Sequence, residues 1–389
     1  MKRLPSLFAS LLLLSSFGCR EDNTDAEQPV DMTVATEQDM TVSEDLTTNP
    51  VDLAGADLTP LPEPAEFIVL RVGDGTNALA GTAAPGFLER RKVSGGSLVG
   101  TPKALPTAVS GTNRILTITG TSTAEGQLSR SEDGRFVLVG GYDAAVGMAT
   151  SSGTANRTIG RLDNTGTLDT STSSDFLSNN SFRGVASNNG NDLWAAGASG
   201  IIYTTFGSTT KPTGSLLTNN MRWLNVFGGQ LYASSASGTT QGINTIGANG
   251  NGLPKTTATA TLLSGFAAQT STSHYGFVAF DRDGNPGIDV IYVADDRGSA
   301  AGGGVQRWKL SGTTWSLAGT LAKNLTAGAR GLAGFVSGNN VVLLATTAES
   351  PPRVVSFVDD GSAIDMIGAT ALATAATNTA YRGIALAPQ

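Results

Sequence analysis

The stretch Tyr381-Arg382-Gly383-Ile384-Ala385-Leu386 is the last copy of a pattern that recurs through the chain. Successive copies stand roughly 50 residues apart, a spacing typical of repeat architectures. The earlier copies are Phe182-Arg183-Gly184-Val185-Ala186, Met221-Arg222-Trp223-Leu224-Asn225, the more degenerate His274-Tyr275-Gly276-Phe277-Val278, and Ala329-Arg330-Gly331-Leu332-Ala333. Only three residues follow the last copy. We therefore expect another part of the chain to complete the unit that it begins.

Each complete copy is followed by a turn and by further short apolar runs, as in Val290-Ile291-Tyr292-Val293-Ala294 and Gly304-Val305-Gln306-Arg307-Trp308. The runs are rich in β-branched and aromatic residues and are bounded by Gly, Asn, Asp and Ser, which indicates strands and turns. A weaker fourth run, 315–321, ends its unit. Four antiparallel strands in a unit of roughly 50 residues are typical of a β-propeller blade. The sequence thus predicts an all-β fold.

The remaining runs indicate how many blades to expect. Residues 126–130 begin a less regular unit, whereas 67–72, 86–90 and 97–100 look like strands two, three and four with no first strand before them. The C-terminal copy supplies that strand, and pairing it there removes the free edges of an open sheet. We predict a propeller domain over 66–389 with six four-stranded blades, closed by the C-terminal strand. Seven blades stay open if residues 101–182 contain an extra short one.

The first residues predict export and a lipid anchor. Lys2 and Arg3 precede the apolar run 7–14, which is too short for a membrane span of ~20 residues and fits a signal peptide. Gly18-Cys19 then resembles the lipobox of bacterial lipoproteins, although Ser16-Phe17 depart from its usual residues. The resemblance implies a signal peptide over 1–19, a lipidated Cys19 and contact with a membrane through the lipid.

Acidic residues gather in the segment after Cys19. Residues 20–66 hold 13 acidic side chains and one basic one, with no aromatic residue. Such a segment cannot bury enough apolar surface to fold, so we expect a disordered tether over 20–65. Its Asp-Leu/Met-Thr units resemble the spacers of Gram-negative surface lipoproteins. The resemblance implies an exported protein at the outer membrane or cell surface, and leaves the leaflet open.

Composition excludes several classes of site. The chain has one Cys and one His, which rules out a disulfide framework, a Cys-rich zinc site and a triad of histidine ligands. Its net charge of −7 comes from the tether, so the rest of the chain is nearly neutral and has no basic stripe for nucleic acid. We expect a monomer.

One loop has the pattern of a cation site. In 281–289, oxygen-bearing side chains stand at the first, third, fifth and ninth positions. The loop is similar to the calcium loops of integrin-type propeller repeats, although Pro286 replaces the usual glycine. The resemblance implies a structural calcium, with the carbonyl of Gly287 as a further ligand. The implied side-chain ligands are Asp281, Asp283, Asn285 and Asp289. The alternative is an Asp/Gly-rich turn that needs no metal.

The repeated arginines form a second candidate site. If strand one lines the central channel, the side chains at its start converge at one mouth and favour carboxylate or phosphate. The residues expected there are Arg183, Arg222, His274, Arg330 and Arg382, with Arg130 as a further arginine. The alternative is that each arginine binds carbonyls or an Asp of a neighbouring blade.

Other polar and aromatic residues receive structural interpretations. His274 is expected to be a polar residue of the mouth, not a general base, since no nucleophile stands near it in the sequence. Asp295-Asp296 either joins the calcium loop or pairs with Arg297. Trp194, Trp223 and Trp308 are expected in the core, and Trp315 at the surface.

These observations predict a lipid-anchored propeller that acts as a binding or scaffold module, without a catalytic site. The ligand, whether protein, glycan or small anion, stays open. The competing hypothesis is an enzyme similar to the lactonase and phytase types of six-bladed propeller, which use a metal at the channel mouth. Such a site needs several convergent carboxylate, amide or His ligands, and the repeats offer arginine instead. A third hypothesis is a purely structural surface protein. Fold alone selects none of them.

Overall fold

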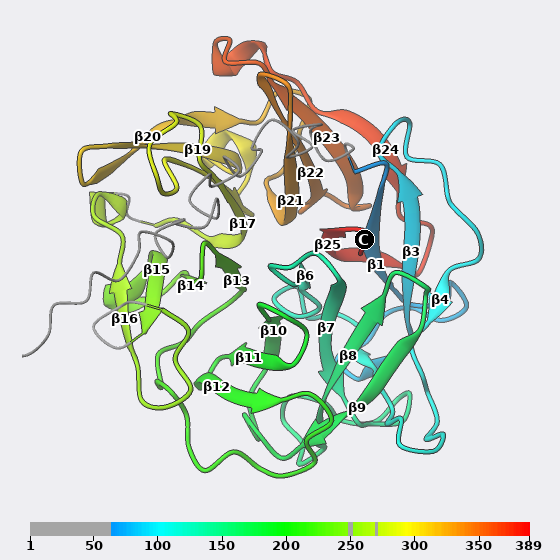
Figure 1. The fold of residues 1–389 in the computed structure, drawn as a ribbon. Helices are drawn as coiled ribbons and strands as arrows, with labels where there is room; N and C mark the ends of the chain where they lie inside the picture. Colours follow the sequence, from blue (N-terminus) through cyan, green and yellow to red (C-terminus); the bar gives the residue numbers. More distant parts are fainter. Residues whose placement is uncertain (1–63, 248–251, 269–270) are drawn as a thin grey trace, which may run out of the picture. The chain divides into compact units, whose positions relative to one another are not determined.

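Six small antiparallel sheets follow one another around a ring and form the blades of a β-propeller (Figure 1). The structure is a computed structural model that describes residues 64–247, 252–268 and 271–389. The predicted signal peptide, Cys19 and the tether up to residue 63 lie outside the described residues. The predictions of an all-β propeller and of six blades are confirmed, and residues 101–182 contain one blade, not two.

The strands of each blade follow one another from the channel outward. Blade 1 contains β25 (Ala380–Leu386), β1 (Glu66–Val72), β3 (Gly86–Lys92) and β4 (Lys103–Ala104). Blade 2 contains β6 (Leu128–Arg130), β7 (Phe136–Tyr142), β8 (Arg157–Asp163) and β9 (Leu168–Ser174). Blade 3 contains β10 (Phe182–Ala186), β11 (Asp192–Gly197) and β12 (Gly200–Thr205). Blade 4 contains β13 (Leu224–Phe227), β14 (Gln230–Ser235), β15 (Gly242–Gly247) and β16 (Thr259–Leu262). Blade 5 contains β17 (His274–Phe280), β18 (Val290–Asp295), β19 (Gly304–Ser311) and β20 (Thr314–Leu321). Blade 6 contains β21 (Ala329–Ser337), β22 (Asn340–Thr347), β23 (Arg353–Asp359) and β24 (Thr370–Thr374).

Two outer strands differ from the regular pattern. In blade 3 the fourth strand is reduced to a single bridge between Ile201 and Leu217. In blade 1 the fourth strand is β4, and of the predicted stretch 97–100 only Leu98 bridges to Arg91. Gly100 has a φ of 67°, a left-handed conformation that turns the chain and ends the pairing there. An additional two-stranded sheet pairs β2 (Ala83–Ala84) with β5 (Ile118–Thr119).

The two ends of the propeller meet in blade 1. Strand β25 is antiparallel to β1, with Phe67 opposite Leu386 and Val72 opposite Ala380. In Figure 1 the red β25 lies beside the blue β1 on the channel side of the blade. Closure by the C-terminal strand was predicted from the repeat series, and the strand order agrees with it. Both edges that an open ring would expose are thereby paired.

The hydrophobic core is divided among the six junctions between neighbouring blades. Each buried cluster joins side chains of two adjacent blades, and six clusters complete the circle. At the closing junction, Phe67 and Ile384 of blade 1 pack with Leu344 and Val354 of blade 6. Because burial of apolar surface is the main stabilising term, each junction depends on both of its blades.

Helical structure in the described residues is limited to single 3-10 turns. They are η2 (Gly238–Thr240), η3 (Phe266–Ala268), η4 (Ser299–Ala301) and η5 (Ile364–Met366). No helix among these residues has the length and apolar character needed to cross a bilayer.

We predict that the closing strand controls the stability of the whole ring. Ile384 is 1% exposed and belongs to the closing cluster, so Ile384→Ala should lower the free energy of unfolding by ~2–5 kcal/mol, the usual cost of a large-to-small core change. Deletion of residues 380–389 should abolish the cooperative transition, because blade 1 would lose its inner strand. Thermal and urea unfolding followed by circular dichroism measure both effects.

The matched control is Val358→Ala in β23, where the side chain is 51% exposed and the expected change is within ~0.5 kcal/mol. A truncated protein that melts at the same temperature as the full chain would show that β25 does not belong to the ring.

Candidate functional site

A β-bulge at the start of the inner strands aims a set of side chains toward one mouth of the channel. The pairing register shifts by one residue at Arg183 in β10, and it shifts near Arg330 in β21 and Arg382 in β25. Strand β17 has the same irregularity after His274. Bulges re-aim side chains and strengthen the local twist. Four inner strands thus share one local distortion at the same level.

The neighbours of the bulges identify the equivalent residue in each blade. Gly276 lies against the backbone of Arg330 and Leu332, which places Tyr275 at the level of Arg330. The amide of Gly383 donates to the carbonyl of Gly126 at 2.9 Å, which places Gly126 at the level of Arg382. In ring order from blade 1, the mouth positions are Arg382, Gly126, Arg183, Arg222, Tyr275 and Arg330. We call this group the arginine mouth.

Arg183 and Arg222 each reach to the next blade. A terminal guanidinium nitrogen (Nη1) of Arg183 donates to the carbonyl of Met221 at 2.9 Å and to the side chain of Asn220 at 2.6 Å. The corresponding nitrogen of Arg222 donates to the carbonyl of His274 at 3.1 Å and to the hydroxyl of Ser273 at 3.0 Å. Within the described residues, neither has a carboxylate within 4.0 Å, and the buried Nε of Arg183 has no partner. Burial, and then the nearby Arg222, lower the pKa of Arg183.

Among the described residues, the other half of the mouth holds one arginine with a carboxylate partner and one without. Arg330 forms an ion pair with Asp296 at 3.1 Å, whereas Arg382 donates to the carbonyls of Gly120 and Ser122 at 2.9 and 3.1 Å. Burial, and then the neighbouring Arg330, lower the pKa of Arg382 to about 10. Tyr275 lies between the two halves, with its ring centre 4.0 Å from the guanidinium carbon of Arg222 and 6.0 Å from that of Arg330. These contacts are cation–π interactions.

A buried carboxyl, Glu125, lies close to the mouth and acts on the pKa values of Arg183 and Arg382. Its Oε1 accepts a hydrogen bond from the hydroxyl of Tyr142 at 2.9 Å. Burial raises the pKa of Glu125. Among the described residues, Arg183, Arg222 and Arg382 have no carboxylate within 4.0 Å, whereas Arg330 pairs with Asp296, so the mouth holds more arginines than paired carboxylates.

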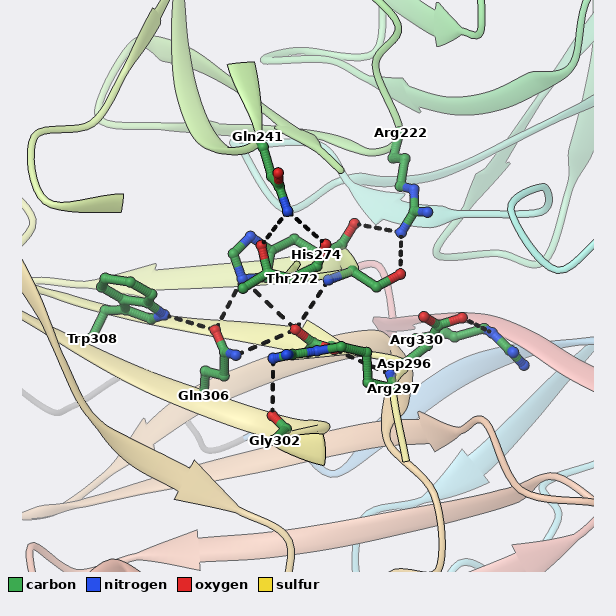
Figure 2. A network of polar contacts seen from close by, with 12 residues as sticks. Arg222, Gln241, Thr272, His274, Asp296, Arg297, Gly302, Gln306, Trp308 and Arg330 are labelled. Atoms are coloured by element: carbon green, nitrogen blue, oxygen red, sulfur yellow. Dashed lines mark hydrogen bonds and ion pairs between the residues drawn. The ribbon is translucent and has the colours of Figure 1, made fainter. Parts of the chain in front are cut away.

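His274 is not a residue of the mouth, which corrects our expectation. It occupies the position one residue before the bulge, and its side chain is fully buried. Figure 2 shows the ring in a network with Gln306 and Trp308. Its Nε2 lies 2.9 Å from Oε1 of Gln306, which also accepts from the Trp308 indole at 3.1 Å. Burial lowers the pKa of His274 to about 4 despite Asp295 nearby, so the ring is neutral at pH 7.

Three further expectations concern single side chains near the channel and the core. Asp295 pairs with Arg297 at 2.9 Å, as one alternative held, whereas Asp296 binds Arg330 instead. Arg130 is the last residue of β6 and lies at the opposite end of the inner strand from the arginine mouth. Trp315 is 5% exposed, so the expectation of a surface tryptophan was wrong.

The turn between β17 and β18 gathers the acidic residues of the predicted cation loop. Carboxylate oxygens of Asp281, Asp283 and Asp289 lie within 4.8 Å of one another. Asp289 accepts the amide of Arg282 at 2.6 Å, and Asn285 donates its side-chain amide to Asp283 at 3.0 Å. These three carboxylates are the residues that could hold a hard cation, for which oxygen ligands are suited. The same hydrogen bonds also suit an Asp-rich turn, so calcium binding stays a prediction.

Sequence comparisons identify no family. No family model and no curated protein matches the chain. Among solved structures, it is similar to a chain in the nidogen/laminin complex, with 14% identity, a TM-score of 0.44, and coverage of 82% of this chain and 97% of that one. It is also similar to the periplasmic gluconolactonase PpgL of Pseudomonas aeruginosa, with 14% identity, a TM-score of 0.44 and coverages of 80% and 83%. A protein of unknown function from Bacteroides caccae has 9% identity, a TM-score of 0.42 and coverages of 82% and 98%. Likenesses at these values carry no argument about function.

We predict that His274 stays neutral in the folded protein down to about pH 4 and makes the fold acid-sensitive. Because its pKa in the folded state lies below the ordinary value of 6.5, protonation favours the unfolded chain. Its contribution is intact above pH 6.5 and is lost as the pH falls from 6.5 toward 4, by about 3 kcal/mol at 1.36 kcal/mol per pKa unit. Since His274 is the only histidine, its ring proton signals in NMR can be assigned without ambiguity.

A titration midpoint of the His274 signals near pH 6.5 in the folded protein would contradict this interpretation. In His274→Gln, urea unfolding should show a shallower loss of stability between pH 6.5 and 4 than in the wild type.

Proposed function

We propose that this chain is a non-enzymatic binding module of the cell envelope, and that its arginine mouth binds a small anionic ligand through carboxylate or phosphate oxygens. The observation that carries the proposal is the pair Arg183 and Arg222. Both guanidinium groups are half-buried and near each other, and neither has a carboxylate partner within 4.0 Å among the described residues. Guanidinium groups bind such oxygens by charge-assisted, often bidentate, hydrogen bonds.

The arginines also have the structural role that we expected as the alternative. Their bonds to Met221, His274 and Gly120 fasten neighbouring blades to each other. Those bonds use only part of each guanidinium group, which has five N–H donors. For Arg222 the bonds involve one nitrogen, Nη1. The structural role therefore leaves donors with which Arg222 can bind an anion.

The arrangement of residues does not favour the enzyme hypothesis with a metal at the mouth. None of the six mouth positions holds a carboxylate. Of the two acids nearest to them, Asp296 is engaged by Arg330, and Glu125 is buried against Tyr142. In the described part of the chain, the group of three acidic residues that converge is the one in the β17–β18 turn. A turn on one blade differs from a site that several blades assemble around the channel.

The location at the envelope rests on the sequence alone. The basic start, the short apolar run and Gly18-Cys19 support lipidation of Cys19, and the acidic segment after it supports a tether that holds the propeller away from the membrane. A lipid anchor of more than one acyl chain gives stable attachment to a bilayer.

The anion site is tested with inorganic phosphate and, separately, citrate. Both should raise the melting temperature of the wild-type protein in a concentration-dependent way. Arg183→Gln and Arg222→Gln should each weaken the fitted affinity by roughly tenfold or more, since a hydrogen bond to a charged group contributes ~1.5–3 kcal/mol. Titration calorimetry gives the affinities directly.

Arg135→Gln is the control, because Arg135 is an exposed arginine whose partner is Asp133. It should bind phosphate like the wild type. Variants that melt normally without ligand and still bind phosphate and citrate with wild-type affinity would refute the arginine mouth as the site.

The anchor is tested by Cys19→Ser in the full chain, expressed in a Gram-negative host. The wild type should partition into the detergent phase of a membrane extract, and Cys19→Ser should move to the aqueous phase because it cannot be acylated. Ser16→Ala, which keeps the cysteine, serves as the control. Equal partitioning of wild type and Cys19→Ser would exclude a lipid anchor at this residue.

A further inference from the structure

A cavity of about 540 Å³ lies at the end of the channel opposite the arginine mouth. It is formed where the inner strands of five blades end, together with the turns that follow β13 and β17. Blade 3 does not contribute to it. Its volume falls within the usual range of small-molecule sites, roughly 300–1,000 Å³. We call it the apolar pocket.

The pocket lining combines aliphatic residues with polar ones. Leu128, Val226, Val278, Leu332 and Ile384, one from each contributing blade, are all at most 8% exposed and also pack between the blades. Such a wall holds the apolar body of a ligand through close van der Waals contacts, which are individually small and collectively large.

A side chain next to the pocket lining bridges two inner strands that are not neighbours in the ring. Gln127 reaches from blade 2 across to blade 4, where its side-chain amide donates to the carbonyl of Leu224 at 2.5 Å and its carbonyl accepts the amide of the same residue at 3.0 Å. A Cβ atom on Gly184 would lie 1.8 Å from Oε1 of Gln127, so glycine is needed where this side chain passes β10. None of the six positions of the arginine mouth is among the residues that line the pocket.

One partly buried cation faces this pocket. Arg130 lines it and is half-buried, and burial lowers the pKa of its guanidinium group. Among the described residues its hydrogen bond is a long one, 3.4 Å to the carbonyl of Ala387, and it has no carboxylate within 4.0 Å, although the charge of Asp133 opposes the lowering of its pKa. A Cβ atom on Gly134 would come within 3.0 Å of the guanidinium, so the turn after β6 packs against the group and orients it. Arg130 thus has donors for an anionic ligand.

The acidic residues around the pocket limit how much negative charge a ligand can carry. Glu132 and Asp281 are both exposed, and Glu132 accepts the amide of Gly229 at 2.7 Å. Two carboxylates in solvent at the rim repel a ligand with several negative charges, although salt screens the effect. A single carboxylate held at Arg130 meets the least repulsion.

From this combination of a cavity of suitable volume, aliphatic wall residues and an arginine without an ion-pair partner among the described residues, we propose that the apolar pocket binds a small monocarboxylate with an apolar body, of the short fatty acid class. The carboxylate accepts hydrogen bonds from Arg130, and the aliphatic chain lies against the inner strands of blades 4, 5, 6 and 1. Contacts between the ligand's aliphatic chain and the pocket wall supply affinity. The hydrogen bonds from Arg130 favour a carboxylate over an uncharged ligand with the same aliphatic chain.

Octanoate and octan-1-ol separate the contribution of the carboxylate from that of the aliphatic chain. Inorganic phosphate reports on the arginine mouth alone. Octanoate should bind the full chain, as measured by titration calorimetry below its micellar concentration. Octan-1-ol, with the same chain and no charge, should bind at least tenfold more weakly. Arg130→Gln should weaken octanoate binding about tenfold or more and leave octan-1-ol binding unchanged, since a charge-assisted bond is lost. Arg130→Lys, which keeps the charge, should retain part of the affinity.

Lys211→Gln removes an exposed cation that pairs with Asp175 and does not line the pocket, so this variant should bind octanoate like the wild type. Octanoate affinity that is equal in wild type and Arg130→Gln, or equal affinity for octanoate and octan-1-ol, would overturn the proposal. Phosphate binding at the arginine mouth should be unchanged in Arg130→Gln, and octanoate binding unchanged in Arg222→Gln. Failure of one site is thus distinguishable from failure of the other.

Discussion

The antiparallel pairing of β25 with β1 is the interaction on which the rest of the molecule depends. The core is a circle of six junctions, and two of them, between blades 6 and 1 and between blades 1 and 2, include residues of β25. The same strand brings Arg382 to one mouth and Ile384 to the opposite pocket. Closure therefore determines the stability of the ring and supplies one wall of each candidate site.

A second constraint is the bulge at the start of the inner strands. Regular pairing alternates side chains between the two faces of a blade, and both faces pack against neighbouring blades. The extra residue breaks this alternation once, so that Arg183, Arg330 and Arg382 leave the packing and reach over the ends of the blades. Arg183 and Arg382 donate there to backbone carbonyls of the next blade, whereas Arg330 binds the carboxylate of Asp296. Arginine can serve both kinds of acceptor, which explains why one residue type recurs. Positive charge accumulates as a consequence of that structural role.

The repeat period and turn residues were enough to predict the blades, their number and the closing strand, because each unit carries its own hydrophobic pattern. Errors arose where a copy was aligned on the wrong residue. Aligning Gly276 with Gly331 would have placed Tyr275 at the mouth and His274 in the core, as the structure does. Arg130 was misplaced because its strand has no arginine at the bulge level, where Gly126 stands. The apolar pocket had no signal in the sequence, since its lining comes from five separate strand ends.

The two ends of the channel differ because the inner strands change character along their length. Near the bulge, backbone carbonyls are left without strand partners and require donors, which arginines supply. Past Gln127 the inner strands pair regularly, and polar side chains there, such as Asn225, donate to carbonyls of the next blade while aliphatic ones pack between the blades. The hydrogen bonds of Gln127 to Leu224 lie between the level of the arginine mouth and the residues that line the pocket. A ligand at one end thus contacts residues that have no part in the other site, although both ends share the rigidity of the closed ring.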